Sequence, residues 1–318
     1  MRCWVVVILC PFLACIAHAQ PCPSKPVRVI VNFPPGAGVD IATRLVTAKL
    51  TETLGWQFVA DNRAGAAGNI GVELAAHAAP DGYTLLAATA AAAISQSMHS
   101  KVSFDLVRDF VPVALIASAP FILAVHPAVP ANSLRELIAL AKSRPGQLSY
   151  ATPGTGSTPH LAGELLKMET GIDLLHVPYK GTVPAITDVI AGNVSMALAN
   201  TLVVLPQMKA GRLRAIAITS ATRSATAPEL PTVAESGVRG FESGTWYGLL
   251  APAATPRDIV NRVNAAVVRV VQLADVREKL NAQGAEPLSG TPGQVGEFVR
   301  SEVAKYVKVV KAAGIRLE

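Results

Sequence analysis

Residues 27–54 read VRVIVNFPPGAGVDIATRLVTAKLTETL, and this stretch decides what kind of fold the chain builds. Residues 27–33 are rich in β-branched side chains and nearly apolar on both faces, which is typical of an interior strand of a parallel sheet. The prolines and glycine at 34–36 end that strand. In residues 40–54 the apolar side chains fall on adjacent helical rows, and Gly55 supplies a stop. The segment therefore predicts strand, glycine loop and helix, the opening unit of an α/β fold.

The alternation of strands and helices continues along the chain. Further strands are expected at 56–60, 83–88, 121–126, 148–151, 174–177, 195–198, 213–218 and 246–251, and helices at 70–79, 134–143, 160–169, 183–191, 205–210, 256–273 and 292–312. Residues 223–244 are rich in turn-forming residues and are expected to form a linker. The 318 residues exceed what one hydrophobic core usually serves, so two lobes are expected.

A second glycine loop, TPGTGSTP at residues 152–159, again lies between an expected strand and an expected helix. Thr158 is expected to cap this helix and Pro159 to open it. Both glycine loops place backbone N–H groups at the positive end of a helix, which is a geometry that binds anions. Each hydrogen bond to a charged group contributes about 1.5–3 kcal/mol and the helix dipole about 0.3–1 kcal/mol, so the amides should dominate.

Nucleotide binding is the first alternative, because glycine loops also hold phosphates. Gly36 and Gly38 begin like a dinucleotide motif, but Ile41 stands where a glycine or alanine allows close helix packing. A Gly-Lys-Ser/Thr element follows neither loop. The sequence therefore favours a carboxylate over a nucleotide.

The sequence contains few motifs that are typical of enzymes. The six histidines lack metal-ligand spacing, and a Gly-x-Ser-x-Gly elbow is absent. Ser157 and His160 are neighbours, but we expect the serine to donate a hydrogen bond within the loop and the histidine to orient it. Asp40 is expected to satisfy loop amides more than to face an anionic ligand, which it would repel. Tyr179 is a candidate hydroxyl donor to the ligand, and Tyr247 is expected to line the core or a cleft wall.

The composition argues against a nucleic-acid binder. The chain has 28 Lys and Arg against 22 Asp and Glu, a formal net charge of +6, and only 5% aromatic residues. The basic residues are scattered and do not form a stripe interleaved with aromatics. We predict no nucleic-acid partner, no cofactor and no metal.

Residues 1–19 have the pattern of a secretory signal peptide, with an apolar run at 5–17 and a small-x-small site at 17–19. The run is shorter than the roughly 20 residues that a membrane-spanning helix needs. Cys15 follows Phe-Leu-Ala, which partly resembles a lipoprotein cleavage site, but ordinary cleavage after Ala19 fits better. Three of the four cysteines leave with this segment. We expect a monomer in a bacterial periplasm.

Motifs along the whole mature chain resemble one family. They are KPVRVIV at 25–31, FPPG at 33–36, DNR at 61–63, GNIG at 68–71, APDGYTLL at 79–86, HLAGE at 160–164, HVPYKG at 176–181, PTVAE at 231–235 and GLLAP at 248–252. Together they resemble the Bug family, the solute-binding proteins of tripartite tricarboxylate transporters.

The resemblance implies a type 2 periplasmic-binding-protein fold, in which two lobes, each a sheet flanked by helices, are joined by crossing hinge strands. The first lobe would comprise residues 24–124 and 246–318, and the second residues 125–245 with the return linker. The implied function is capture of a small organic carboxylate and its delivery to membrane permease subunits, without catalysis. The alternatives are a ligand sensor for a receptor kinase and a secreted hydrolase using Ser157 and His160.

In the family, the two glycine loops hold the carboxylate through amides, hydroxyls and ordered waters. The ligand-binding residues implied for this chain are Phe33, Gly36, Ala37, Gly38, Asp40, Thr89, Thr152, Gly154, Thr155, Gly156, Ser157, Thr158, His160, Tyr179 and Asn200. No catalytic residue and no metal ligand are implied.

This sequence departs from the family pattern in three places. Ala37 separates two glycines that are usually consecutive, which narrows the freedom of the backbone. Residues 89–93 are alanine-rich where relatives tend to carry glycine or serine, and Ala199 stands where relatives often have aspartate. These departures predict a less polar cleft floor and a preference for acids with an apolar or aromatic body over acidic amino acids.

Overall fold

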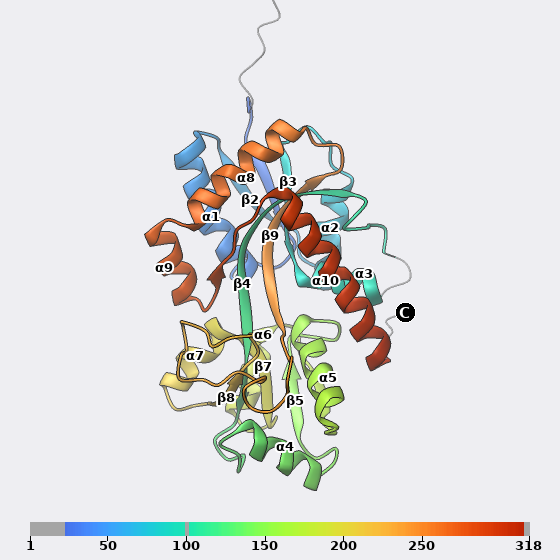
Figure 1. The fold of residues 1–318 in the computed structure, drawn as a ribbon, viewed down its shortest axis with the longest axis vertical. Helices are drawn as coiled ribbons and strands as arrows, with labels where there is room; N and C mark the ends of the chain where they lie inside the picture. Colours follow the sequence, from blue (N-terminus) through green and yellow to red (C-terminus); the bar gives the residue numbers. More distant parts are fainter. Residues whose placement is uncertain (1–22, 99–101, 315–318) are drawn as a thin grey trace, which may run out of the picture.

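The computed structural model describes residues 23–98 and 102–314, and the predicted signal peptide and Cys15 lie outside the described residues. Strands and helices alternate as the sequence predicts, so the α/β class is confirmed. The elements form an upper and a lower lobe in Figure 1, and two long strands run along the axis that joins them. None of the described helices is long and apolar enough to cross a membrane.

The first lobe is a sheet covered by helices on both faces. Its strands are β1 (Val27–Val31), β2 (Phe58–Asn62), β3 (Thr84–Thr89), the first part of β4 (Phe110–Val125), β9 (Gly244–Pro252) and β10 (Glu286–Pro287), in the order β2-β1-β3-β9-β4-β10. β1 is parallel to β2 and β3, whereas β9 is antiparallel to β3 and β4.

The helices of this lobe divide between two buried apolar clusters. One face is covered by α1 (Gly38–Leu54), α8 (Arg257–Val271) and α9 (Ala274–Ala282), and the other by α2 (Asn69–Ala76), α3 (Ala90–Met98) and α10 (Pro292–Ala313). A short turn of 3-10 helix, η1 (Ala66–Gly68), precedes α2.

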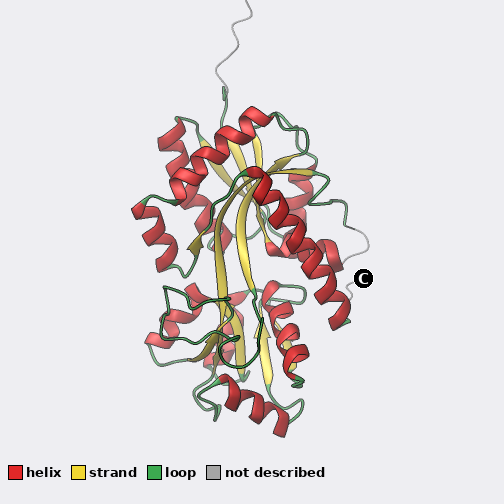
Figure 2. Ribbon diagram, viewed as in Figure 1, coloured by secondary structure: helices red, strands yellow, loops and turns green. Residues whose placement is uncertain are grey.

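The second lobe repeats this arrangement on a smaller scale (Figure 2). Its strands are the end of β4, β5 (Ser149–Thr152), β6 (Leu175–Pro178), β7 (Met196–Asn200) and β8 (Arg214–Ile218), in the order β8-β4-β7-β5-β6. One face packs against α4 (Leu134–Ser143) and α5 (Thr158–Thr170), the other against α6 (Thr182–Ile190) and α7 (Thr201–Lys209).

A single strand, β4, belongs to both sheets. From Phe110 to Pro120 it pairs with β9, and from Phe121 to Val125 it pairs with β7 and β8. Its hydrogen-bond partners therefore change between Pro120 and Phe121. The exact lobe boundaries stay a prediction.

Several elements differ from the sequence-based expectation, among them the short η1 and β10. The strand expected at 121–126 is the end of the 16-residue β4, which was hidden because prolines at 112 and 120 usually interrupt strands. Helix α3, which follows Thr89 directly, was not expected, because its first alanines are all buried and so show no polar helical face. The helix expected at 256–273 is followed at once by a second one, α9.

The start of α2 is packed closely against the end of β1. A Cβ atom at Gly71 would lie 2.8 Å from both the Arg63 carbonyl oxygen and the Asn32 Cα. Both neighbours are main-chain atoms, which move only if the sheet edge or the helix moves. Glycine is therefore required here by a close approach of backbones.

We expect Gly71→Ala to lower the free energy of unfolding by about 1–3 kcal/mol, the usual cost of overpacking. Helix propensity alone would raise the free energy of unfolding, because it favours alanine over glycine by about 1 kcal/mol. The packing argument therefore predicts a change of the opposite sign. Urea unfolding followed by circular dichroism measures the change. Gly293→Ala in α10 is the matched control, because its Cβ would meet only the Thr291 hydroxyl at 4.0 Å. Equal stability of the two variants would contradict the packing argument.

Candidate functional site

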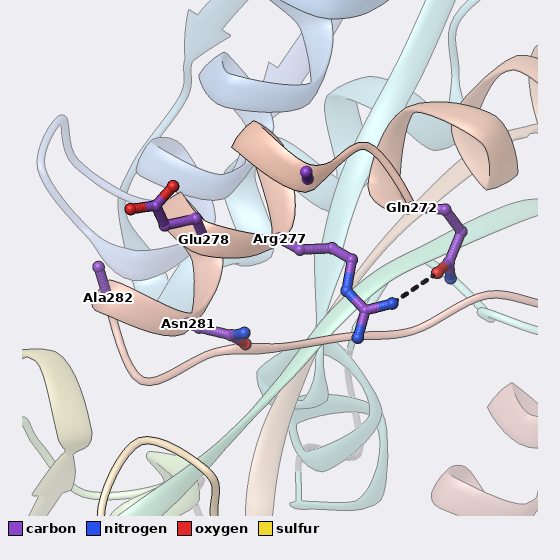
Figure 3. Close-up of a pocket in the computed structure, with 6 residues that line it drawn as sticks. Gln272, Arg277, Glu278, Asn281 and Ala282 are labelled. Atoms are coloured by element: carbon purple, nitrogen blue, oxygen red, sulfur yellow. Dashed lines mark hydrogen bonds between the residues drawn. The ribbon is translucent and has the colours of Figure 1, made fainter.

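A surface pocket of about 700 Å³ lies at the end of α8 and along α9 (Figure 3). Its lining residues are Gln272, Ala274, Arg277, Glu278, Asn281 and Ala282. Arg277 donates to the Gln272 side chain at 3.2 Å, and most of the lining is exposed. This pocket contains none of the predicted ligand residues, so the candidate site is sought at the loops.

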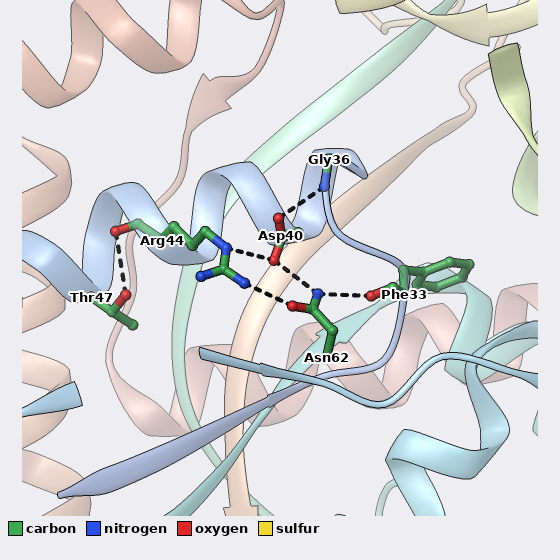
Figure 4. A network of polar contacts seen from close by, with 6 residues as sticks. All are labelled: Phe33, Gly36, Asp40, Arg44, Thr47 and Asn62. Carbon is green, nitrogen blue, oxygen red and sulfur yellow. Dashed lines mark hydrogen bonds and ion pairs between the residues drawn. The ribbon is translucent and has the colours of Figure 1, made fainter. Parts of the chain in front are cut away.

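The first glycine loop is held by a buried carboxylate (Figure 4). Asp40 is 3% exposed and accepts hydrogen bonds from the Gly36 N–H at 2.9 Å, Arg44 Nε at 2.9 Å and Asn62 Nδ2 at 2.8 Å. The same Asn62 nitrogen donates to the Phe33 carbonyl at 2.9 Å. Burial by itself would raise the pKa of Asp40, but these donors more than offset it and leave the pKa below its usual value. Asp40 is therefore a charged anchor of the loop.

The start of α1 keeps unpaired donors. Ala37 occupies the N-cap position without a side-chain cap. Helix geometry leaves the N–H groups of Gly38, Val39 and Asp40 without intrahelical acceptors. Within the described residues these three N–H groups have no other acceptor. The Gly36 N–H is occupied by Asp40, so the available donors lie on the helix start and not on the first glycine of the loop.

Two side chains from distant parts of the chain lie against Gly38. A Cβ atom at this position would collide with the Tyr247 hydroxyl and lie 3.7 Å from the Asn200 amide nitrogen. Tyr247 comes from β9, where it pairs with Thr89 at the end of β3, and Asn200 ends β7 of the second lobe. Tyr247 is 4% exposed, and burial raises its pKa, so the hydroxyl stays protonated.

The second glycine loop is capped by Ser157. Its hydroxyl accepts from the His160 N–H at 3.4 Å and donates to the Gly154 carbonyl at 2.7 Å. The sequence predicted Thr158 as the cap, but the cap is Ser157, one residue earlier. Ser157 has extended backbone angles, whereas Thr158 is already helical. The Gly156 N–H donates to His160 Nδ1 at 3.1 Å, which assigns the ring proton of neutral His160 to Nε2.

A column of stacked rings supports this loop. His160 stacks on His176 with ring centroids 4.0 Å apart, and His176 lies over Tyr150 at 4.9 Å. The Thr152 hydroxyl is 2.7 Å from His176 Nε2. Burial lowers the pKa of both histidines, and the neighbouring His160 adds to this effect for His176, whose pKa falls to about 4. Both rings are therefore uncharged at neutral pH.

Several predicted ligand residues have polar groups that are occupied within the protein. The Tyr179 hydroxyl donates to Asp188 Oδ2 at 2.5 Å. The Thr89 hydroxyl accepts from the Ala91 N–H at 3.2 Å, and the Gly154 N–H donates to Thr152 at 3.3 Å. In the second loop the N–H groups of Thr155 and Thr158 are left without an acceptor among the described residues.

Ser157 and His160 are not arranged as a nucleophile and its base. The serine hydroxyl donates to a backbone carbonyl, and the imidazole Nδ1 accepts from a backbone N–H. Among the described residues no hydrogen bond joins the hydroxyl to the ring. A secreted hydrolase would need that bond, or a close approach to it, to activate the serine.

The predicted residues gather at the carboxyl ends of strands. Phe33, Gly36, Ala37, Gly38 and Asp40 follow β1, Thr89 ends β3, Thr152, Gly154, Thr155, Gly156, Ser157, Thr158 and His160 follow β5, Tyr179 follows β6, and Asn200 ends β7. This edge is where open α/β sheets bind ligands. Tyr247 was missed as a site residue, because an aromatic residue at the start of an apolar strand is usually part of the core.

Comparison with known proteins finds a matching family model and similar sequences. The family model described as "Tripartite tricarboxylate transporter family receptor" matches residues 42–315. The chain is 36% identical to BugT of Bordetella pertussis over 308 residues, covering 96% of this chain and 94% of BugT.

Solved structures give the same result for the fold. The structure of R. palustris Rpa4515 with adipate has a TM-score of 0.85 and 37% identity, covering 92% of this chain and 99% of that one. MatC from Rhodopseudomonas palustris with bound malate has a TM-score of 0.81 and 32% identity, covering 91% and 99%. The two-lobed binding-protein fold implied by the sequence resemblance is therefore confirmed.

The histidine column predicts a loss of stability in mild acid. Between pH 6.5 and about 4 the unfolded chain binds protons at His160 and His176 while the folded chain resists them, so the free energy of unfolding should fall as the pH falls through this window. His176→Gln should reduce the slope of stability against pH, measured by urea unfolding at several pH values. His77→Gln, which removes an exposed histidine outside the column, should keep the wild-type slope. Identical slopes in all three proteins would contradict the prediction.

Proposed function

The chain belongs to the tripartite tricarboxylate transporter receptor family, and on that premise we propose that it binds a small organic carboxylate between its two glycine loops and delivers it to a membrane permease. The family consists of periplasmic solute-binding receptors, so the resemblance seen in the sequence is confirmed. We further propose that residues 1–19 direct export of the chain, and that the predicted loop residues contact the ligand.

One observation carries the proposal, namely the convergence of donors at the start of α1. The unpaired N–H groups of Gly38, Val39 and Asp40 lie at the positive end of the helix, and Tyr247 and Asn200 approach the same point. An ionised carboxylate is an acceptor at both oxygens and complements such a set. The helix dipole adds a smaller favourable term.

Relatives support the class of ligand. Rpa4515 was solved with adipate and MatC with malate, and both are small dicarboxylates. Position 199, where relatives often carry aspartate, is an alanine in this chain and belongs to a buried apolar cluster of the second lobe, so it offers no carboxylate to a ligand amino group. We therefore expect acids with an apolar or aromatic body to bind more tightly than aspartate or glutamate.

The contact between the lobes supports capture by closure. Helix α5, which begins at the second glycine loop, packs against α3 and α10 of the first lobe. Its Leu161 is 2% exposed and belongs to the apolar cluster of the first lobe. A ligand between the loops is then shielded from water, which strengthens its contacts with the amides, and the closed shape is what a permease would recognise.

A thermal-shift screen tests the ligand class. The panel contains adipate, malate, citrate, benzoate, aspartate and glutamate. A ligand present at about 100 times its dissociation constant stabilises the folded protein by about 2.7 kcal/mol, a shift of a few degrees for a chain of this size. Absence of a shift with every acid would contradict the proposal. Uptake of the labelled acid by cells that carry the permease, with and without this protein, tests delivery.

Gly38→Ala should abolish binding of the acid that stabilises the wild-type protein most. The new methyl group would displace the Tyr247 hydroxyl and crowd the donors at the start of α1. Isothermal titration calorimetry measures the affinity, and circular dichroism checks that the variant is folded. Gly293→Ala is the control and should bind like the wild-type protein, because its methyl group meets only the Thr291 hydroxyl, at 4.0 Å. Wild-type affinity in Gly38→Ala would place the ligand elsewhere.

A further inference from the structure

We propose that Tyr247 determines ligand specificity by donating its hydroxyl hydrogen to the carboxylate at the start of α1, beside the amide of Asn200. This inference rests on the proposed function and adds a residue that the family resemblance did not imply for the site. Tyr247 lies on β9, a strand of the first lobe, whereas Asn200 ends β7 of the second.

Among the tyrosines of this protein, Tyr247 differs in having no hydrogen-bond partner for its hydroxyl within the described residues. The hydroxyls of Tyr150, Tyr179 and Tyr306 donate to Glu164, Asp188 and the Gly244 carbonyl. The Tyr83 hydroxyl accepts from the Ser24 N–H. For Tyr247, 4% exposed, the described residues supply no hydrogen-bond partner. The side chain is mostly buried, but its hydroxyl oxygen is not among the fully buried atoms that lack a partner, so it reaches solvent beside Gly38. A ligand acceptor can therefore replace the water that this hydroxyl would otherwise bind.

The surroundings of the hydroxyl identify the missing partner as an anion. The hydroxyl lies against Gly38, where the unpaired groups of α1 are N–H donors, and the nearby atom of Asn200 is its amide nitrogen. The site therefore offers donors from the helix, from the crossing strand and from the second lobe. The carboxylate in the first turn of α1, Asp40, already accepts from Gly36, Arg44 and Asn62. An acceptor carried by the ligand satisfies the Tyr247 hydroxyl without disturbing this network.

Because the helix N–H groups, the Tyr247 hydroxyl and the Asn200 amide are all hydrogen-bond donors, the site would select among ligands by their acceptors. A carboxylate has lone pairs for every donor, whereas the nitrogen of a primary carboxamide would direct its own hydrogens at them. A polar group left unpaired in a buried site costs more than a missing contact at the surface. Tyr247 should therefore contribute to discrimination between a carboxylic acid and its amide. Because the strand pairing of β9 with β3 and β4 fixes Tyr247, the acid reaches both it and Asn200 only when the lobes are close.

The test compares Tyr247→Phe with the wild-type protein and with Tyr306→Phe. Tyr306 is the matched control, because it is also buried and its hydroxyl contacts Gly244 at the start of the same strand. The probes are adipate, malate and benzoate together with their primary amides, titrated calorimetrically. The melting temperature of each protein is measured without ligand.

Tyr247→Phe should weaken binding of the acids by about tenfold to a hundredfold, the range expected for one hydrogen bond to a charged group. It should also reduce the preference for each acid over its amide. Its melting temperature without ligand should equal or exceed that of the wild-type protein, because no hydrogen bond within the described residues is lost. Tyr306→Phe should keep the wild-type affinity and preference.

Two results would overturn the inference and leave the proposed function standing. One is an affinity of Tyr247→Phe within about twofold of the wild-type value with an unchanged acid preference. The other is a melting temperature of unligated Tyr247→Phe several degrees below the wild-type value, since the hydroxyl would then serve the fold. If the wild-type protein bound none of the acids, both the inference and the proposed function would fail.

Discussion

The pairing of β4 with two different sets of strands is the constraint on which the arrangement of this protein depends. Pro120 of β4 lies opposite Gly244 of β9, and the next residue, Phe121, lies opposite Asn200 of β7. The end of β7 and the start of β9 are thereby brought to neighbouring positions along one strand. Tyr247 follows shortly after Gly244, so its approach to the Asn200 side chain is a consequence of strand register.

The two glycine loops are held in place by the same kind of hydrogen bond. In each, a buried side chain from the first turns of the following helix accepts the N–H of a loop glycine. Asp40 does this for Gly36 and His160 does it for Gly156. These hydrogen bonds hold the loops from within the protein, and the donors that remain are those at the helix starts, whose positions the helices fix.

The loops differ in charge, and this difference affects how each is maintained. The first depends on an ionised carboxylate that Arg44 and Asn62 stabilise, and its charge is directed into the protein. The second depends on an uncharged imidazole kept neutral by burial and by a stacked second ring. Asp40 stays ionised where His176 begins to bind protons, because its hydrogen-bond donors hold its pKa below the usual 3.8 and the pKa of His176 is about 4.

The sequence by itself determined the alternation of strands and helices, the two glycine loops at helix starts and the family, because hydrophobic periodicity, turn residues and short motifs are local properties. It missed the length of β4, since prolines at 112 and 120 resemble strand ends, and it missed α3, since buried alanines show no amphipathic period. The tertiary structure alone decided which donors are unpaired and where Tyr247 points. Whether a hydroxyl or an N–H has a partner depends on residues as far apart in the chain as Gly38, Asn200 and Tyr247, which meet only when two sheets share one strand.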